Sequence, residues 1–537
     1  LLLADAAPAA PSGSRYAALL ADPMVTRKLA AAALLEETRS LNEGLVETLA
    51  GDPDPLVRVR CAEALGRIGT AETVPWLVSL ADDEDDRVVL AAAFGLGLTG
   101  GEAAVEPLGA LLAAGPPAVK QAAVRALGRC GDRAAVPLLV PRLTDFHGSL
   151  RAEAATALAL IGDSTAAGDI VKTLDDPSPA VVAAGLYALG RLGAKTEANR
   201  IASLLDRDDL AVRRRAAEAL GRLEAKEAAP ALAALAGGDP LTAAVAATAL
   251  GRIGGKEGSR GLEPFLAAPD PLVRAAALRA IAEIGRGDAY EHVLPLLSDA
   301  SEMARRAAIE AVAATGGAKA APRIRPFLDD DAPAVRMTAA AALGRAGQAG
   351  DLPLLVDSLA SCNTPLVREG AATGLGRWPD REVLGRPLRE DTSAVDLLFA
   401  AADDDDWVVA STAVEALGRV AGPTEIPRLV RIFPRHNDRV DGDRKLAVIE
   451  AIRTIAARGS LPDSIRARGA SFLRLAAVHA DPRVAEAASK AAPLFGERIR
   501  ARPAGVWKRG RSPWREPALP LGPRWLRLRT QRGEVVI

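Results

Sequence analysis

The chain has 537 residues, a formal net charge of −1, a hydrophobic content of 49% and an aromatic content of only 3%. Alanine is the commonest hydrophobic residue, and an alanine-rich core with few aromatics favours closely packed helices over a sheet sandwich. Basic residues gather in residues 497–537, and the 56 Lys and Arg against 65 Asp and Glu in residues 1–496 argue against a body that binds nucleic acid.

Residues 1–19 are expected to form no regular structure. The first eleven residues (LLLADAAPAAP) fit either the end of a cleaved signal segment or a cut made through a longer gene. An extracytoplasmic location, for example the periplasm, agrees with the first interpretation and a cytoplasmic location with the second. The sequence therefore leaves the compartment unknown. No apolar run reaches the roughly 18 residues of a membrane span.

Residues 20–496 repeat the motif V-R-x-x-A-A-x-A-L-G-R-I-G, which is clearest at residues 57–69, 212–223 and 335–347. The glycine of its Leu-Gly pair, or a replacement, recurs every 30 to 32 residues up to a last interval of 42. These positions are Gly66, Gly97, Gly128, Ala159, Gly190, Gly221, Gly251, Ala282, Ala313, Gly344, Gly376 and Gly418. We expect this glycine to allow either a tight helix crossing or a helix exit.

Each unit is predicted to be a helical hairpin. In residues 73–97, apolar residues three or four apart occur before and after an Asp-rich turn, as expected for two helices with one buried face each. Aspartates in this turn are expected to cap the second helix. Prolines are expected in the first turn of the first helix, where an N–H has no intrahelical partner. These prolines are Pro75, Pro107, Pro137, Pro230, Pro295 and Pro353.

The repeated units resemble HEAT repeats, especially the short bacterial type also seen in phycobilin-lyase-like proteins. The resemblance covers about residues 20–496 and implies an all-α fold, an α-α superhelix in which stacked hairpins share one core. It says little about function, because the family includes scaffolds, lyase subunits and a few enzymes. Residues 378–396 and 434–445 depart from the pattern and are either inserted loops that carry binding residues or decayed repeats.

The sequence contains no recognisable reaction centre, so we predict no catalytic residue, no metal ligand and no cofactor. The four histidines are scattered, and the His-Glu pairs by which HEAT-like deoxyhypusine hydroxylases bind iron are absent. Cys61, Cys130 and Cys362 lack metal or disulfide spacing, and Cys61 is expected to be inert core. The acidic turns at residues 82–86 and 403–406 are expected to cap helices.

Two series of basic residues recur in register with the repeat. The first follows the motif valine and is expected to pair with aspartates of neighbouring units. Its members are Arg58, Lys120, Arg151, Arg213, Arg274, Arg305, Arg336 and Arg368. The second follows the glycine and would form a ridge that meets carboxylates of an extended partner. Its members are Arg67, Arg129, Arg191, Arg222, Arg252, Arg345, Arg377 and Arg419. Solvation or pairing with helix C-terminal carbonyls is the alternative for this second series.

The chain ends differently from its body. Residues 497–524, rich in Pro, Arg and Trp, are predicted to be a linker. Residues 525–537 alternate in hydropathy around a Gln-Arg-Gly-Glu turn, which predicts a β-hairpin. With Thr530, Gly533 and Val535 this hairpin resembles the first hairpin of cyclophilin-type peptidyl-prolyl isomerases, which implies the start of a truncated β domain and a bacterial HEAT–cyclophilin fusion as parent.

We therefore expect a protein–protein interaction scaffold with protein partners on its concave face, no nucleic acid and no membrane span. With an isomerase domain in the parent protein, the solenoid would raise the local concentration of a client near that domain. The alternative is an enzyme subunit or chaperone of the bilin-lyase-like HEAT type, with an apolar pocket on the concave face. The sequence gives neither the partner's identity nor the oligomeric state.

Overall fold

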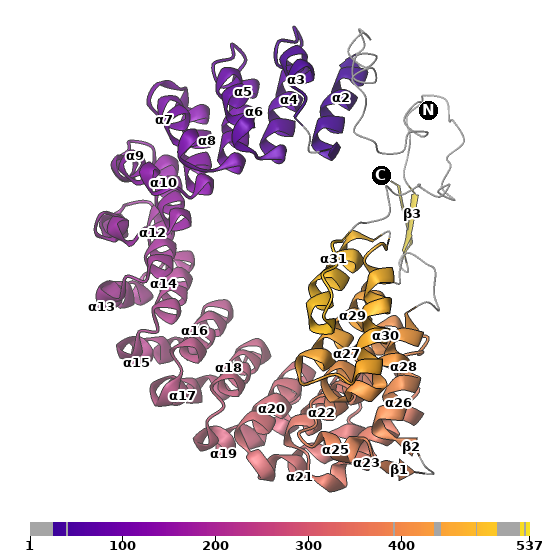
Figure 1. The fold of residues 1–537 in the computed structure, drawn as a ribbon. Helices are drawn as coiled ribbons and strands as arrows, with labels where there is room; N and C mark the ends of the chain where they lie inside the picture. Colours follow the sequence, from indigo (N-terminus) through magenta and orange to yellow (C-terminus); the bar gives the residue numbers. More distant parts are fainter. Residues whose placement is uncertain are drawn as a thin grey trace.

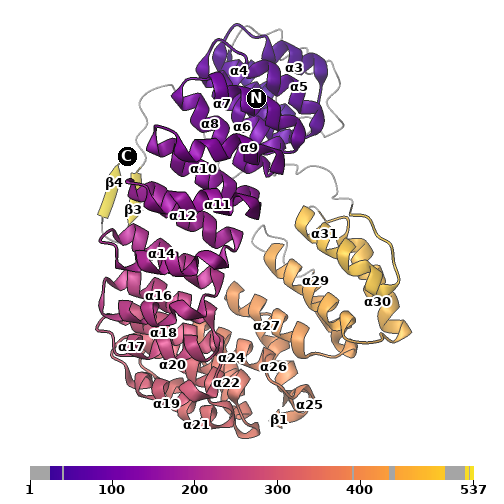
Figure 2. The same cartoon turned by 90° about the vertical axis from the view of Figure 1, so that its left-hand side faces the viewer.

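The structure is a computed structural model that describes residues 25–38, 41–389, 392–433, 442–479, 481–501, 527–530 and 533–536. Helical hairpins stack side by side into a curved arc (Figure 1). Seen from the side, the stack descends from α4 to α21 and rises again through α27, α29 and α31 (Figure 2). The predicted all-α solenoid is confirmed. The predicted N-terminal segment 1–19 and most of the predicted linker 497–524 lie outside the described residues.

The longer helix of each hairpin lies on the inner side of the arc (Figure 1). Its start follows the predicted turn chemistry: Asp54, for example, accepts the backbone N–H of Leu56 at 2.9 Å, and Pro55 stands at the first helical position. The inner helices are α2 (Val25–Thr38), α4 (Pro55–Ile68), α6 (Asp86–Thr99), α8 (Pro117–Cys130), α10 (Gly148–Ile161), α12 (Pro179–Leu192), α14 (Leu210–Leu223), α16 (Pro240–Ile253), α18 (Pro271–Ile284), α20 (Glu302–Thr315), α22 (Pro333–Ala346), α24 (Pro365–Gly376), α27 (Trp407–Val420), α29 (Gly442–Ala457) and α31 (Pro482–Ala491).

The outer helices are mostly shorter, and several continue as 3-10 turns. They are α3 (Glu43–Ala50), α5 (Val74–Leu80), α7 (Val105–Ala114), α9 (Val136–Leu139), α11 (Ala167–Ile170), α13 (Ala198–Ala202), α15 (Ala229–Ala233), α17 (Gly255–Leu266), α19 (Tyr290–Val293), α21 (Ala320–Ile324), α23 (Leu352–Ser361), α25 (Arg381–Leu384), α26 (Ala394–Ala401), α28 (Ile426–Ile432) and α30 (Asp463–Ala476). Five of the six prolines lie in the first turn as predicted. The prediction for Pro295 is wrong: α19 begins at Tyr290, and this proline lies in the 3-10 turn Leu294–Ser298 that follows it.

The repeated glycines lie where neighbouring inner helices cross. A Cβ atom on Gly97 would come within 2.8 Å of the Cα of Ala126, and one on Gly221 within 2.7 Å of the Cα of Ala249. Each such alanine belongs to the Ala-Leu-Gly of the next unit, so the motif specifies both sides of its own contact. The close approach is therefore the correct one of the two predicted roles, and a different glycine, such as Gly69 with φ 66°, ends the helix.

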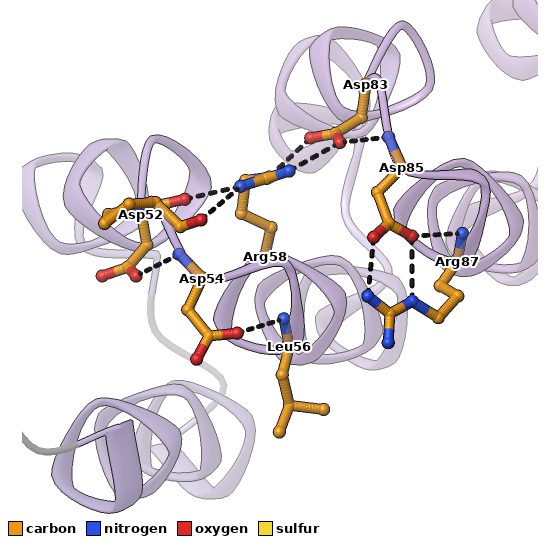
Figure 3. A network of polar contacts seen from close by, with 8 residues as sticks. Asp52, Asp54, Leu56, Arg58, Asp83, Asp85 and Arg87 are labelled. Atoms are coloured by element: carbon orange, nitrogen blue, oxygen red, sulfur yellow. Dashed lines mark hydrogen bonds and ion pairs between the residues drawn. The ribbon is translucent and has the colours of Figure 1, made fainter.

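Arginines of the first series link successive units along one edge of the stack. Arg58 donates from Nε and Nη2 to both carboxylate oxygens of Asp83, at 2.7 and 2.8 Å, and from Nη1 to the carbonyl oxygen of Asp52 at 2.8 Å (Figure 3). These bonds hold the pKa of Asp83 below its ordinary value. The same carboxylate accepts the N–H of Asp85, which caps α6. One ion pair thus fixes the turns of two adjacent hairpins.

The predicted pairing is confirmed for five members of this series and is wrong for three. The five pairs are Arg58 with Asp83, Arg151 with Asp176, Arg274 with Asp299, Arg305 with Asp330, and Arg368 with Asp404. Arg213 and Arg336 bond only carbonyl oxygens of their own turns, because the next turn carries no aspartate in register. Lys120 forms no ion pair with any described residue.

Two short antiparallel ladders interrupt the helices. In the predicted departure at residues 378–396, α25 is followed by the strands β1 (Pro387–Arg389) and β2 (Thr392–Ser393). At the C-terminus, β3 (Arg527–Thr530) pairs with β4 (Gly533–Val536), with Thr530 opposite Gly533. The predicted terminal hairpin is therefore confirmed. The loop expected at residues 434–445 falls mostly outside the described residues.

Candidate partner-binding surface

Each inner helix leaves one stripe of side chains uncovered. In α4, Val57 and Leu65 are fully buried, whereas Leu56, Arg60 and Arg67 lie on the opposite side and are partly or fully exposed. Their spacing is that of one face of a helix. The inner helices lie on the concave side of the arc (Figure 1), and the outer helix of each hairpin packs on the other side of its inner helix. We infer that the uncovered stripe is turned toward the concave side.

The second arginine series lies on this stripe, and we call it the inner arginine row. Seven of its members stand in the last turn of an inner helix, and Arg377 is the residue that follows α24. All eight side chains are exposed. The row is Arg67, Arg129, Arg191, Arg222, Arg252, Arg345, Arg377 and Arg419. Leu98, Leu160, Glu283 and Ala314 replace arginine elsewhere, so the row contains two runs of three successive units.

Three arginines of the row contact carboxylates of the chain. The distances are 2.5 Å from Arg67 to Glu36, 2.8 Å from Arg222 to Glu218 and 3.8 Å from Arg419 to Glu415. Solvent-exposed pairs of this kind contribute at most about 1 kcal/mol, so carboxylates of a partner could replace them. Arg191 instead donates from Nε to the carbonyl oxygen of Ala159 at 3.0 Å, the helix C-terminal contact that the alternative interpretation requires.

Aromatic rings lie beneath two arginines of the row. The guanidinium carbon of Arg129 lies 4.7 Å from the ring centre of Phe94, and that of Arg222 lies 5.6 Å from the ring centre of Tyr187. Cation–π contacts of this kind orient an arginine without neutralising its charge. Neither aromatic residue was among the residues predicted from the sequence. In the sequence, each aromatic residue precedes its arginine by one repeat unit plus one helical turn, and this spacing could have indicated the contact.

Arg252, Arg345 and Arg377 form no ion pair with a described residue. Arg345 and Arg377 belong to the C-terminal run, where Arg345, Arg377 and Arg419 line a surface hollow of about 560 Å³ together with Trp378 and Arg381. Partial burial, and then the charges of Arg345 and Arg419, lower the pKa of Arg377 from its ordinary value. The structure thus brings together three arginines that the sequence placed only in register.

The other candidate groups have structural roles. Asp85 and Asp406 cap α6 and α27, as predicted for the acidic turns. Cys61 is fully buried, and burial raises its pKa to about 12. The described part of the chain contains no group of three His, Cys, Asp or Glu side chains placed to hold a metal ion. None of its helices combines the length and hydropathy that a bilayer-spanning segment requires.

The family model for HEAT repeats matches the chain in eight stretches, most of which overlap. The stretches are residues 42–118, 105–184, 136–210, 167–251, 232–301, 259–333, 290–376 and 381–453. The chain belongs to the HEAT-repeat family. No curated protein matches the chain in sequence at a significant level.

Solved HEAT-repeat structures show the same fold at low sequence identity. Yeast importin-β (Kap95p) has a TM-score of 0.64 at 12% identity, covering 90% of this chain and 76% of that chain. Importin-β crystallised in ammonium sulfate has a TM-score of 0.56 at 15% identity, covering 90% and 78%. The CpcE–CpcF complex of phycocyanin lyase from Nostoc is 24% identical over 51% of this chain and 94% of that chain, but its TM-score of 0.27 is too low to support any inference.

Proposed function

We propose that this HEAT-repeat protein is a scaffold whose concave face binds an extended, acidic segment of a partner protein. The inner arginine row is the observation that carries the proposal. It places exposed guanidinium groups in register on successive helices, and five of the eight form no ion pair with a carboxylate of the described residues. A solved complex of the similar solenoid Kap95 with Nup1, at 15% identity and a TM-score of 0.58, supports a protein partner.

The spacing of the row favours an extended segment over a folded surface. Packed helices lie about 8–10 Å apart, and an extended chain advances about 3.3 Å per residue. Each step along the row therefore corresponds to about three residues of the partner. We expect Asp or Glu near every third position of the bound segment, over each run of three arginines.

Charge reversal on the two sides of the arc tests the proposal. The inner variant carries Arg191→Glu, Arg222→Glu and Arg252→Glu. The control variant reverses three exposed arginines on the outer helices α17, α21 and α30 that form no ion pair with described residues; these are Arg260, Arg323 and Arg468. Both variants have the same net charge, so only the position of the change differs.

The readout is quantitative affinity capture of partners from cells that make the protein. We expect the inner variant to recover the specific partners at about one-tenth of the wild-type level or less, given about 1 kcal/mol or more per charge pair, and the control to recover them unchanged. Unchanged recovery by the inner variant would eliminate the row as the contact.

We further propose that the scaffold holds its client near a cyclophilin-type isomerase domain that begins at β3 and β4. The paired strands, with Thr530 opposite Gly533, support this part of the proposal. Reading the gene beyond the codon for Ile537 tests it. A continuation without cyclophilin motifs would remove the isomerase, and the scaffold proposal would stand unchanged.

A further inference from the structure

Four of the seven residues that line the hollow in the C-terminal run of the row are arginines. Its walls are Arg345 at the end of α22, Arg377 after α24, Arg381 at the start of α25 and Arg419 at the end of α27. Trp378 supplies an apolar surface between them, and no carboxylate lines the hollow. The four guanidinium groups come from four different helices or turns, so the fold of the whole junction is needed to assemble them.

This hollow results from a local change in the repeat. Helix α24 ends at Gly376, and the chain then turns so that Trp378 is 5% exposed and packs on the backbone of Gly347. A Cβ atom on Gly347 would lie 2.8 Å from the indole ring, so the glycine makes room for the tryptophan. The inserted residues then bring Arg381 to the same place. Units with the regular spacing have neither feature.

The described residues supply few carboxylates that balance the charges in the hollow; that of Glu310 acts on Arg377 without forming an ion pair with it. The carboxylate nearest to a lining arginine is that of Glu415, 3.8 Å from Arg419 and 59% exposed. A fifth guanidinium, that of Arg458, lies alongside, where it donates to the carbonyl oxygen of Ala421 at 2.6 Å and also to that of Arg419. Burial and the charge of Arg381 lower the pKa of Arg458. Converging cations of this kind are stabilised by a multivalent anion.

We propose that this hollow is a phosphate-binding site that receives a phosphoserine or phosphothreonine of the partner segment. The inference rests on the proposed function, because the site is continuous with the inner arginine row. A phosphoryl group carries nearly two negative charges and three acceptor oxygens, which suits several guanidinium forks better than a single carboxylate does. The volume of about 560 Å³ leaves room for the residue that carries the phosphate.

A nucleic acid is the less suitable occupant. Its phosphates repeat at short intervals and need a continuous basic track, whereas Glu283 and Ala314 interrupt the row before the hollow. The body from residue 1 to residue 496 also carries more Asp and Glu than Lys and Arg. A single phosphoryl group needs only the local positive charge of the hollow and no continuous basic track.

The test compares two fluorescein-labelled peptides built from Glu, Gly and Ser that differ only in a central phosphoserine. Binding to the full chain is measured by fluorescence anisotropy for wild type, R377Q, R345Q and R252Q. All three arginines are exposed and form no ion pair with a described residue, and Arg252 lies outside the hollow, so R252Q is the matched control. A single-stranded DNA oligonucleotide and free inorganic phosphate serve as competitors.

We expect wild type to bind the phosphopeptide at least about tenfold more tightly, the effect of one good charge-assisted contact. R377Q and R345Q should reduce this preference to less than about threefold, while R252Q weakens both peptides equally and keeps the preference. Inorganic phosphate should displace the phosphopeptide and should leave binding of the unphosphorylated peptide unchanged. Binding of both peptides without a preference, a preference that survives R377Q, or tighter binding of the DNA through the same arginines would overturn the proposal. The first two of these outcomes leave the scaffold proposal standing. Failure of wild type to bind either peptide, together with unchanged partner capture by the inner variant, would count against both the phosphate site and the scaffold proposal.

Discussion

The contribution of the arginine–aspartate pairs to the stack can be measured at Arg305. This side chain donates to both carboxylate oxygens of Asp330, at 3.0 and 2.9 Å, and to the carbonyl oxygen of Asp299 at 3.0 Å. It also donates to the carbonyl oxygen of Ala300 at 3.3 Å, and the change Arg305→Gln removes all four bonds. Arg336 offers a matched control in the next unit, because it bonds the carbonyl oxygens of Asp330 and Asp331, at 2.7 and 3.1 Å, and no carboxylate.

The expected magnitude follows from the burial of the pair. The side chains of Arg305 and Asp330 are 18% and 11% exposed. Exposed ion pairs contribute about 0–1 kcal/mol, and breaking a fully buried one costs about 3–5 kcal/mol, so this nearly buried pair should be worth about 2 kcal/mol. The lost carbonyl bonds add about 1 kcal/mol in each variant. Arg305→Gln should therefore destabilise its junction by about 3 kcal/mol and Arg336→Gln by about 1 kcal/mol.

Hydrogen exchange read by mass spectrometry is the suitable assay, because a solenoid unfolds locally and a single global free energy is not well defined. Peptides from α20 and α22 should lose about 30-fold more protection in Arg305→Gln than in Arg336→Gln, the equivalent of about 2 kcal/mol. Distant peptides from α4 and α6 should be unchanged in both variants. Equal loss of protection in the two variants would refute the assignment of stability to the carboxylate pair.

Three further predictions concern pH, packing and thiol chemistry. Because Arg305 lowers the pKa of Asp330 in the folded state, the contribution of the carboxylate pair is fully present above the unfolded pKa of about 3.9 and is lost as the pH falls through the folded value. The difference in hydrogen-exchange protection of α20 and α22 between wild type and Arg305→Gln should therefore narrow below about pH 4 to the share of the lost carbonyl bonds, about 1 kcal/mol, and a difference that stays unchanged there would contradict the assignment. Gly221→Ala should lower local stability by about 1–2 kcal/mol, measured as lost hydrogen-exchange protection of α14 and α16, since its Cβ would meet the Cα of Ala249 at 2.7 Å. Gly168→Ala, with no atom within 4 Å, should instead raise the protection of its own hairpin, and a rise in both variants would show that the crossing is not tight. Cys61, with its pKa raised to about 12 by burial, should resist alkylation at pH 8 until the protein is unfolded. The partly exposed Cys130 and Cys362 should be alkylated faster than Cys61 in the folded protein, and equal rates for all three thiols would exclude a buried Cys61.

The sequence predicted those features that repeat with the unit. The register of Arg58 with the Asp-rich turn predicted an ion pair between neighbours, and the structure confirms it with Asp83. The glycine in Leu-Gly predicted either a close crossing or a helix exit, and the structure selects the crossing, where one motif supplies both surfaces. The predicted ion pairs of Arg213 and Arg336 were wrong, because the next turn lacks an aspartate in register. The prediction used the position of the arginine in its own unit and did not check the residue in the turn of the next unit.

The features that the sequence did not predict depend on the packing between units. Phe94 and Tyr187 lie beneath arginines of the following helix, a relation that depends on how far one helix is displaced along its neighbour. The hollow around Trp378 depends on the early end of α24 and on the space left by Gly347. Neither is a property of one unit, so periodicity alone does not predict them.

Arginine footprinting tests most directly whether the concave face is the binding surface. Phenylglyoxal modification of each arginine would be measured by mass spectrometry for the free protein and for its complex with a captured partner. The inner arginine row should become protected on binding, with Arg191, Arg222 and Arg252 modified several-fold more slowly, while Arg260 and Arg323 on the outer helices keep their rates. Protection confined to the outer arginines, with the inner row as reactive as in the free protein, would contradict the account.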